Sequence, residues 1–380
     1  MPQVLESIAS DLNDRVFYRE FSFAKSEFVG LGPGDKKEFA DHVVWIDNLL
    51  IIYQAKERTK QKNLTPESER KWFDKKVIGT ATKQVRDTLE FLDQGPVKVR
   101  NTQGHEFDLD RDNVDHVLKL VLYDPSAELP PDRLAVKHHQ SATAGFIHIV
   151  AIKDYFDVCQ VLITPAEVAQ YFDFREQLIT AWIDQSLPKE RALLGQFVVG
   201  DASAAPDDKY AEALDSINAE LDFDMRFVIG GIAERIESAT DTASPTDYYR
   251  IIAEFAKLDR LELAEVKERF TLCLKAALRN ESEGPWRIVS TNTGSGFLFV
   301  ALRAITHAGR VDMLNTMTLV AKYEQHLERQ VGVSIAHEGR DFLIDWCYVE
   351  SPWAPDDELD EMLRNENPFA PMRNVARRRY

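Results

Sequence analysis

The side chains with the clearest chemical potential lie at the two ends of one apolar stretch, between Asp41 and Lys56. Two runs rich in β-branched and aromatic residues flank the pair Asp47-Asn48, a pattern typical of a two-residue hairpin turn. Counting back from this turn places Asp41 opposite Gln54. Because side chains alternate along a strand, Gln54 and Lys56 share one face. We therefore expect a carboxylate, an amide and an ammonium group to meet at one end of the hairpin.

These groups suit a divalent cation that prefers oxygen ligands. Asp41, the side-chain oxygen of Gln54 and the backbone carbonyl of Ala55 would hold Mg²⁺ or Mn²⁺, with water completing the shell. Lys56 would then polarise an attacking water or stabilise negative charge that develops on a phosphate. The plainer alternative is that Asp41 and Lys56 form an ordinary cross-strand surface pair.

The elements that must position this hairpin alternate between helices and strands. Apolar spacing predicts a helix over 5–16 and another over 67–92, and Thr164-Pro165 marks the start of a third. We expect a second hairpin over 97–109 and buried strands over 116–123 and 145–153. This order predicts an α/β or α+β fold with a mixed sheet.

Composition shifts divide the chain further along. The breaker-rich segment 200–208 favours a boundary, so we expect an N-terminal domain over 1–185 and a linker over 186–208. Helical periodicity dominates 209–282, and strand-like runs return in 283–380, which predicts a small C-terminal α/β unit of unknown role.

Composition also bounds function and location. The 63 acidic and 46 basic residues give a net charge of −17, which argues against a protein that coats polyanions in general. Three cysteines, each more than seventy residues from the next, exclude zinc knuckles and a disulfide framework. The acidic N-terminal stretch and the lack of a long apolar run indicate no signal peptide and no membrane span. We expect a cytoplasmic protein.

The charge is reversed locally beside the hairpin. Between Ala55 and Arg86, ten basic side chains face four acidic ones, a local excess of six. This strip would place positive potential next to the candidate site.

The arrangement of Asp41 and Gln54-Ala55-Lys56 resembles the PD-(D/E)xK nuclease superfamily, in the form of Mrr-type restriction endonucleases in which glutamine replaces the middle acid. The likeness covers roughly the first 180 residues. It implies a restriction-endonuclease-like mixed sheet flanked by helices, Mg²⁺-dependent hydrolysis of DNA as an endonuclease, and a role in defence against foreign DNA. It also implies two further catalytic residues, Glu6 on the first helix and Gln84 on the helix after the lysine strand.

Each of these two residues has a plain alternative, since Glu6 also suits a solvated first helical turn and Gln84 an exposed helix position. A different class of function also stays open: a catalytically silent protein that keeps the nuclease scaffold and acts by binding. In either case residues 209–380 offer surface for a homodimer or an activating partner protein.

Overall fold

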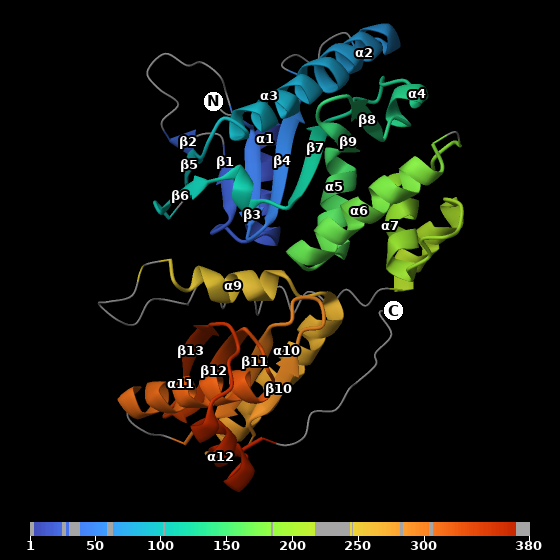
Figure 1. Cartoon of the computed structure of the whole chain (residues 1–380). Coiled ribbons are helices and arrows are strands. Elements are labelled where there is room, and N and C mark those ends of the chain that lie inside the picture. The colour runs from blue at the N-terminus through green and yellow to red at the C-terminus, as the bar shows by residue number, and fades with distance from the viewer. Residues whose placement is uncertain are drawn as a thin grey trace. The chain divides into compact units, whose positions relative to one another are not determined.

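The computed structural model describes most of the chain and divides it into two compact units, Met1–Phe223 and Asp224–Arg379. The described residues are 4–24, 28–29, 39–58, 64–101, 103–183, 185–216, 244, 246–281, 284–303 and 307–369. Figure 1 shows the elements of each unit along the chain.

The first unit is built on a six-stranded mixed sheet. Its strands, in spatial order, are β1 (Ser22–Ala24), β3 (His42–Ile46), β4 (Leu49–Lys56), β7 (His116–Tyr123), β9 (Gly145–Ala151) and β8 (His138–Ser141). The three central strands β4, β7 and β9 run parallel, and the remaining neighbours pair antiparallel. The central strands are apolar on both sides, as expected for strands that helices cover on both faces.

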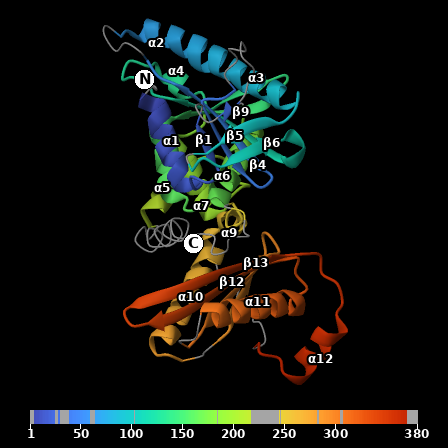
Figure 2. The ribbon, with the colours of Figure 1, turned by 90° about the vertical axis from the view of Figure 1, so that its left-hand side faces the viewer.

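Helices cover both faces of this sheet. The helical elements of the first unit are α1 (Val4–Val16), α2 (Pro66–Trp72), the π-helix η2 (Phe73–Ala81), α3 (Thr82–Leu92), η3 (Arg111–Asn113), α4 (Pro131–Leu134), α5 (Ile152–Val161), α6 (Pro165–Ala181), α7 (Glu190–Val199) and η4 (Asp208–Ser216). Figures 1 and 2 show α2 and α3 as parts of one long helical rod.

The two faces of β4 meet different helices. Leu50 and Ile52 pack in one core cluster with Leu92 of α3. Tyr53, on the alternate face, bonds through its hydroxyl to Tyr155 of α5 at 2.9 Å. The Tyr155 hydroxyl in turn donates to the side chain of a buried asparagine on α1, so α3 covers one face of β4 while α1 and α5 cover the other.

The register predicted for the first hairpin is confirmed. Pairs run from Ile46–Leu49 to His42–Tyr53, and Asp47 at the turn has a φ of 54°. A positive φ at the first turn position is what a tight hairpin of this kind requires. A second hairpin, also as predicted, pairs β5 (Val97–Arg100) with β6 (Glu106–Leu109), and β2 (Phe28–Val29) joins β5 in a small sheet.

The stretch that we predicted as a linker, 186–208, contains helix α7 instead of an extended connection. Apolar side chains of α7, including Leu193 and Leu194, are almost fully buried, so this helix belongs to the first unit. The sequence prediction gave weight to the breakers after residue 199 and missed the apolar content before them. Gly195 lets α7 approach η4 closely, because a Cβ built there would lie 1.9 Å from the Tyr210 carbonyl oxygen.

We predict that Gly195→Ala destabilises the first unit by about 3 kcal/mol, because the obstructing atoms are backbone and have no rotamer with which to escape. Chemical denaturation would measure the change in the free energy of unfolding. Val199→Ala, at an exposed position of the same helix, is the control and should change it by no more than about 0.5 kcal/mol. Equal stability of the two variants would contradict the close approach of the two backbones.

The second unit is a four-stranded mixed sheet with helices. Its elements are α9 (Tyr249–Ala256), α10 (Arg260–Leu278), β10 (Trp286–Val289), β11 (Gly296–Ala301), α11 (His307–Glu324), β12 (Arg329–Glu338), β13 (Asp341–Glu350) and α12 (Asp357–Asn365). The strand order is β10-β11-β12-β13, with β11 and β12 parallel through the crossover α11. Figure 2 shows β12 and β13 as a long hairpin.

Helices α10 and α11 lie on opposite faces of this second sheet. Phe270 of α10 contacts Phe299, whereas Val320 and Ala321 of α11 pack with Leu298 on the other side. Helices α9 and α10, which we predicted as part of a separate helical region, fall within this unit, and residues 217–243 of that region lie outside the described residues. The predicted class, a mixed α/β unit followed by a helical segment and a small C-terminal α/β unit, is confirmed.

Searching the described helices for a segment both long enough and apolar enough to cross a membrane finds none.

Candidate functional site

Asp41 and Lys56 meet at the end of the first hairpin, as the register predicted. Asp41 Oδ2 accepts a hydrogen bond from the Ala55 backbone N–H at 2.9 Å and lies 3.1 Å from the Lys56 ammonium nitrogen. The same ammonium group donates to the Ala55 carbonyl oxygen at 2.8 Å. Both side chains are largely buried, with 6% of Asp41 and 14% of Lys56 exposed. The pair is therefore more shielded from solvent than an ordinary surface ion pair.

Gln54 lies beside this pair and is only 1% exposed. Its side-chain oxygen is buried and accepts no hydrogen bond from any described residue. A buried acceptor without a donor is costly unless a ligand or water satisfies it. This unpartnered oxygen is the structural observation that fits an additional ligand at the site.

The predicted metal ligands differ in how free they are. Gln54 presents an unengaged oxygen, whereas Asp41 Oδ2 and the Ala55 carbonyl oxygen are already bound by the Lys56 ammonium group. The carboxylate, amide and carbonyl oxygens are the donor types that Mg²⁺ or Mn²⁺ prefers. Within the described part of the chain, no three His, Cys, Asp or Glu side chains form a group that could hold a metal ion. Besides the Asp41 carboxylate, a metal ion here would depend on amide, carbonyl, water and substrate oxygens.

Gln84 lies on α3, the helix that covers the Gln54 face of β4. Thr88, one turn further along α3, donates through its hydroxyl to the Phe39 carbonyl, which fixes this helix to the segment that leads into Asp41. The side-chain oxygen of Gln84 is buried and lacks a donor among the described residues, as in Gln54. Gln84 as a whole is half-buried, and its side-chain oxygen is fully buried. It is therefore not the exposed helix residue of the plain alternative.

Glu6 lies on α1, which covers the opposite face of β4. The N-terminus of α1 is nevertheless held at the end of β4, because the Leu5 backbone N–H donates to the Glu57 carboxylate at 3.0 Å. Glu57 directly follows Lys56, so the half-buried Glu6 lies on a turn that is attached to the candidate site. The structure gives no direct contact between Glu6 and Asp41 or Lys56.

Sequence reasoning missed a second cluster at this end of the sheet, centred on Glu69. This carboxylate is fully buried; it accepts from Arg58 Nε at 2.9 Å and from the Ser126 hydroxyl at 2.6 Å. The Arg58 guanidinium also lies 4.3 Å from the ring centroid of Trp72. The cluster ties the end of β4 to α2 and to the loop after β7.

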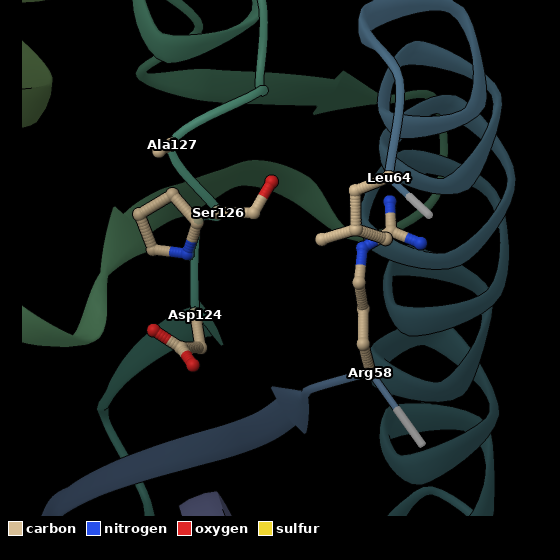
Figure 3. A pocket seen from close by; sticks show the side chains of 6 residues that line it. Arg58, Leu64, Asp124, Ser126 and Ala127 are labelled. Carbon is tan, nitrogen blue, oxygen red and sulfur yellow. The ribbon is translucent and has the colours of Figure 1, made fainter. Parts of the chain in front are cut away.

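A pocket opens beside these residues, with a cavity volume of about 310 Å³. It is lined by Arg58, Leu64, Asp124, Pro125, Ser126 and Ala127. Figure 3 shows Arg58 and Leu64 on one side of it and Asp124, Ser126 and Ala127 on the other. The Asp124 backbone N–H donates to the Lys56 carbonyl at 3.3 Å, so the pocket adjoins the strand that carries Lys56. The sequence offered one signal for this pocket, the polar residues Asp124 and Ser126 that follow the apolar strand 116–123. Because parallel strands end at the same edge of a sheet, such residues are expected to lie near the end of the strand that carries Lys56.

Half of the basic side chains in the strip beside the hairpin form ion pairs with nearby acids. Five of its members form ion pairs with Asp or Glu: Lys56, Arg58, Arg70, Lys71 and Lys83. Lys75, Lys76 and Arg86 form no ion pair with any described residue, and Lys60 and Lys62 lie outside the described residues. The positive potential expected from the sequence is thus carried by few free side chains.

His42, next to Asp41, is held neutral inside the fold. Ser22 gives its hydroxyl hydrogen to Asp14, so the Ser22 oxygen accepts the Nε2–H of His42 at 2.9 Å. Burial lowers the pKa of His42 from 6.5 to about 3.

We predict that the His42 site weakens folding in acid. His42 takes up a proton more readily in the unfolded chain than in the folded one. The free energy of unfolding is therefore highest above about pH 6.5 and declines as the pH falls toward about 3. The expected slope is about 1.4 kcal/mol per pH unit within this window. Urea denaturation across the window would measure it, and His42→Gln should flatten the slope. An unchanged slope in His42→Gln would contradict the burial of a neutral ring.

Comparison of the chain with protein-family models, with curated proteins and with solved structures found no match.

Proposed function

We propose that the first unit is a metal-dependent endonuclease that hydrolyses phosphodiester bonds of DNA, acting in defence against foreign DNA. The observation that carries the proposal is the meeting of Asp41 and Lys56 beside the buried, unpartnered oxygen of Gln54. The resemblance of Asp41 and Gln54-Ala55-Lys56 to Mrr-type PD-(D/E)xK nucleases supports it independently of these distances.

Each residue has a role in this proposal. Asp41, Gln54 and the Ala55 carbonyl would hold Mg²⁺ or Mn²⁺, which supplies positive charge that acidifies water and stabilises phosphate oxygens. Lys56 stabilises the negative charge that develops on the reacting phosphate, since its ammonium group lies at the end of β4 in a partly dehydrated setting. Gln84 on α3 and Glu6 on α1 would orient water or substrate around this centre.

A specific observation favours a second candidate, a silent scaffold that acts only by binding. The Lys56 ammonium group satisfies both Asp41 Oδ2 and the Ala55 carbonyl, so the pair is complete as a structural contact. In this case residues 209–380 would provide the partner surface.

A cleavage time course separates the two candidates. Supercoiled plasmid, linear duplex, single-stranded DNA and RNA would each be incubated with the full chain in Mg²⁺, Mn²⁺ or EDTA. The nuclease proposal expects cutting of DNA with a divalent ion and none in EDTA. Cutting that does not depend on a divalent ion, or that survives Asp41→Ala and Lys56→Ala together, would reject the assigned site. The silent scaffold expects no cutting of any substrate under these conditions.

A further inference from the structure

We infer that the pocket between Arg58 and Asp124 receives one unstacked nucleobase that carries an amino group, such as cytosine, next to the reacting phosphate. The inference rests on the proposed function in that it extends the same site by a base-binding subsite. It is carried by the chemistry of the pocket wall and by its place beside Lys56.

Some polar groups of the pocket wall form hydrogen bonds within the protein and others do not. Glu69 accepts hydrogen bonds from the Ser126 hydroxyl and from Arg58 Nε, and its carboxylate also forms an ion pair with Arg58 Nη2. The exposed Asp124 carboxylate, in contrast, makes no hydrogen bond or ion pair with any residue that the structure describes. Asp124 is therefore a strong acceptor at the pocket that no described residue occupies, and it can accept hydrogen bonds from a ligand that donates N–H groups.

The rest of the wall favours a base over a metal ion. Leu64, Pro125 and Ala127 give the pocket apolar surface, which suits the face of a planar ring and does not suit a hydrated cation. The nearby Arg58 guanidinium also opposes a metal ion, while its Nη1 group has no hydrogen bond to a described residue and can meet a phosphate oxygen. The Asp124 carboxylate matches the amino group of a base, the apolar wall matches the faces of its ring, and the Arg58 guanidinium matches the phosphate of the same nucleotide.

Size and position agree with this ligand. A volume of about 310 Å³ lies at the lower end of the range of roughly 300–1,000 Å³ for small-molecule sites, which is room enough for one base. The hydrogen bond from the Asp124 N–H to the Lys56 carbonyl holds the pocket one strand away from the lysine. Adjacent strands lie about 4.8 Å apart, so a nucleotide in the pocket would be close to the phosphate at Lys56.

Carboxylates recognise cytosine by accepting from its amino group, and thymine has a carbonyl oxygen at the same place. The unmodified full chain should therefore bind short single-stranded oligodeoxycytidine about five to ten times more tightly than oligothymidine. Fluorescence anisotropy of labelled oligonucleotides, in EDTA to prevent cutting, would measure both dissociation constants.

Asp124→Asn is the test variant and Glu128→Gln, an exposed position in the same loop, is its matched control. Removing either charge reduces repulsion of a polyanion. Glu128→Gln should thus raise the affinity for both oligonucleotides or leave it unchanged, and keep the preference. Asp124→Asn should abolish or reverse the preference by weakening binding of oligodeoxycytidine.

Equal affinity of the unmodified chain for the two oligonucleotides, binding of neither, or a parallel shift in both variants would overturn the inference. Because binding is measured without cleavage, the outcomes are separable. A preference that depends on Asp124 in a chain that cuts nothing would reject the nuclease proposal alone. Metal-dependent cutting without the preference would reject the base subsite alone.

Discussion

Replacing Lys56 with alanine should lower the rate of metal-dependent DNA cleavage by about 10²–10³-fold. The ammonium nitrogen lies 3.1 Å from Asp41 Oδ2 and 2.8 Å from the Ala55 carbonyl oxygen, so the positive charge is present at the candidate site before substrate arrives. A cation that is partly shielded from water stabilises developing phosphate charge more strongly than a fully solvated one. Initial rates on supercoiled plasmid would give the size of the loss.

Two further variants make this result specific to the position of the charge. Lys153→Ala removes an equal charge from an exposed position on α5 and should retain the rate of the unmodified protein. Lys56→Arg keeps the charge and should retain part of the activity. Circular dichroism would establish that Lys56→Ala is folded. A folded Lys56→Ala protein that cuts within a few-fold of the unmodified rate would show that Lys56 is not a catalytic residue.

Replacing Glu190 with glutamine should lower the free energy of unfolding of the first unit by about 3–5 kcal/mol. Glu190, at the start of α7, is 2% exposed and accepts from Arg175 and from the Tyr171 hydroxyl, both at 2.6 Å. It also pairs with Lys137 at 3.1 Å. Arg175 has no exposed surface, so the substitution would leave a buried guanidinium without its compensating charge.

Urea denaturation of matched variants would test this account. Glu128→Gln, at an exposed site, should change stability by no more than about 0.5 kcal/mol. The double variant Glu190→Leu, Arg175→Met removes both charges and should be more stable than Glu190→Gln alone, because the fully buried guanidinium is no longer left without a counter-charge, although Lys137 loses its partner in both variants. A double variant that is less stable by the sum of the single effects would contradict the coupling.

The Glu190 carboxylate should also make the stability of the first unit depend on pH in acid. Burial raises the pKa of Glu190, but Arg175 and Lys137 lower it by more, so the pKa lies well below 4.5. A group with a lowered pKa stabilises the fold above the unfolded value, and its contribution is lost as the pH falls below about 4.5. Glu190→Gln should therefore remove part of the acid-induced loss of stability seen in the unmodified protein.

The hairpin was predictable because its information is local. Asp47-Asn48 sets the turn, the flanking apolar runs set the register, and the period of two then places Asp41 beside Lys56. The cap at Thr164 was equally predictable, and its side chain accepts from the Glu167 N–H as expected for a helix start.

The rest depended on contacts between distant segments. Arg58, Glu69 and Ser126 come from three separate elements, and no spacing along the chain announces that they meet. Helix α5 was missed because its first residues continue the apolar run of β9, and a short apolar run does not distinguish a strand from a buried helix. The ion pairs between the basic strip and acids such as Asp132 could not be predicted either, because these acids lie far away along the chain.

The Lys56 ammonium group bridges Asp41 Oδ2 and the Ala55 carbonyl, and the chain thereby carries a tethered counter-ion in its own candidate site. A dissolved cation must compete with this group, which is present at a high effective concentration because it is attached to the same strand. A nucleic-acid phosphate alters the competition, since it offers the ammonium group another partner and releases the two oxygens. Under the proposed function, ion uptake and substrate binding should each strengthen the other. Lys56 would then prevent a metal ion from binding at the candidate site until a phosphate of the substrate is in place.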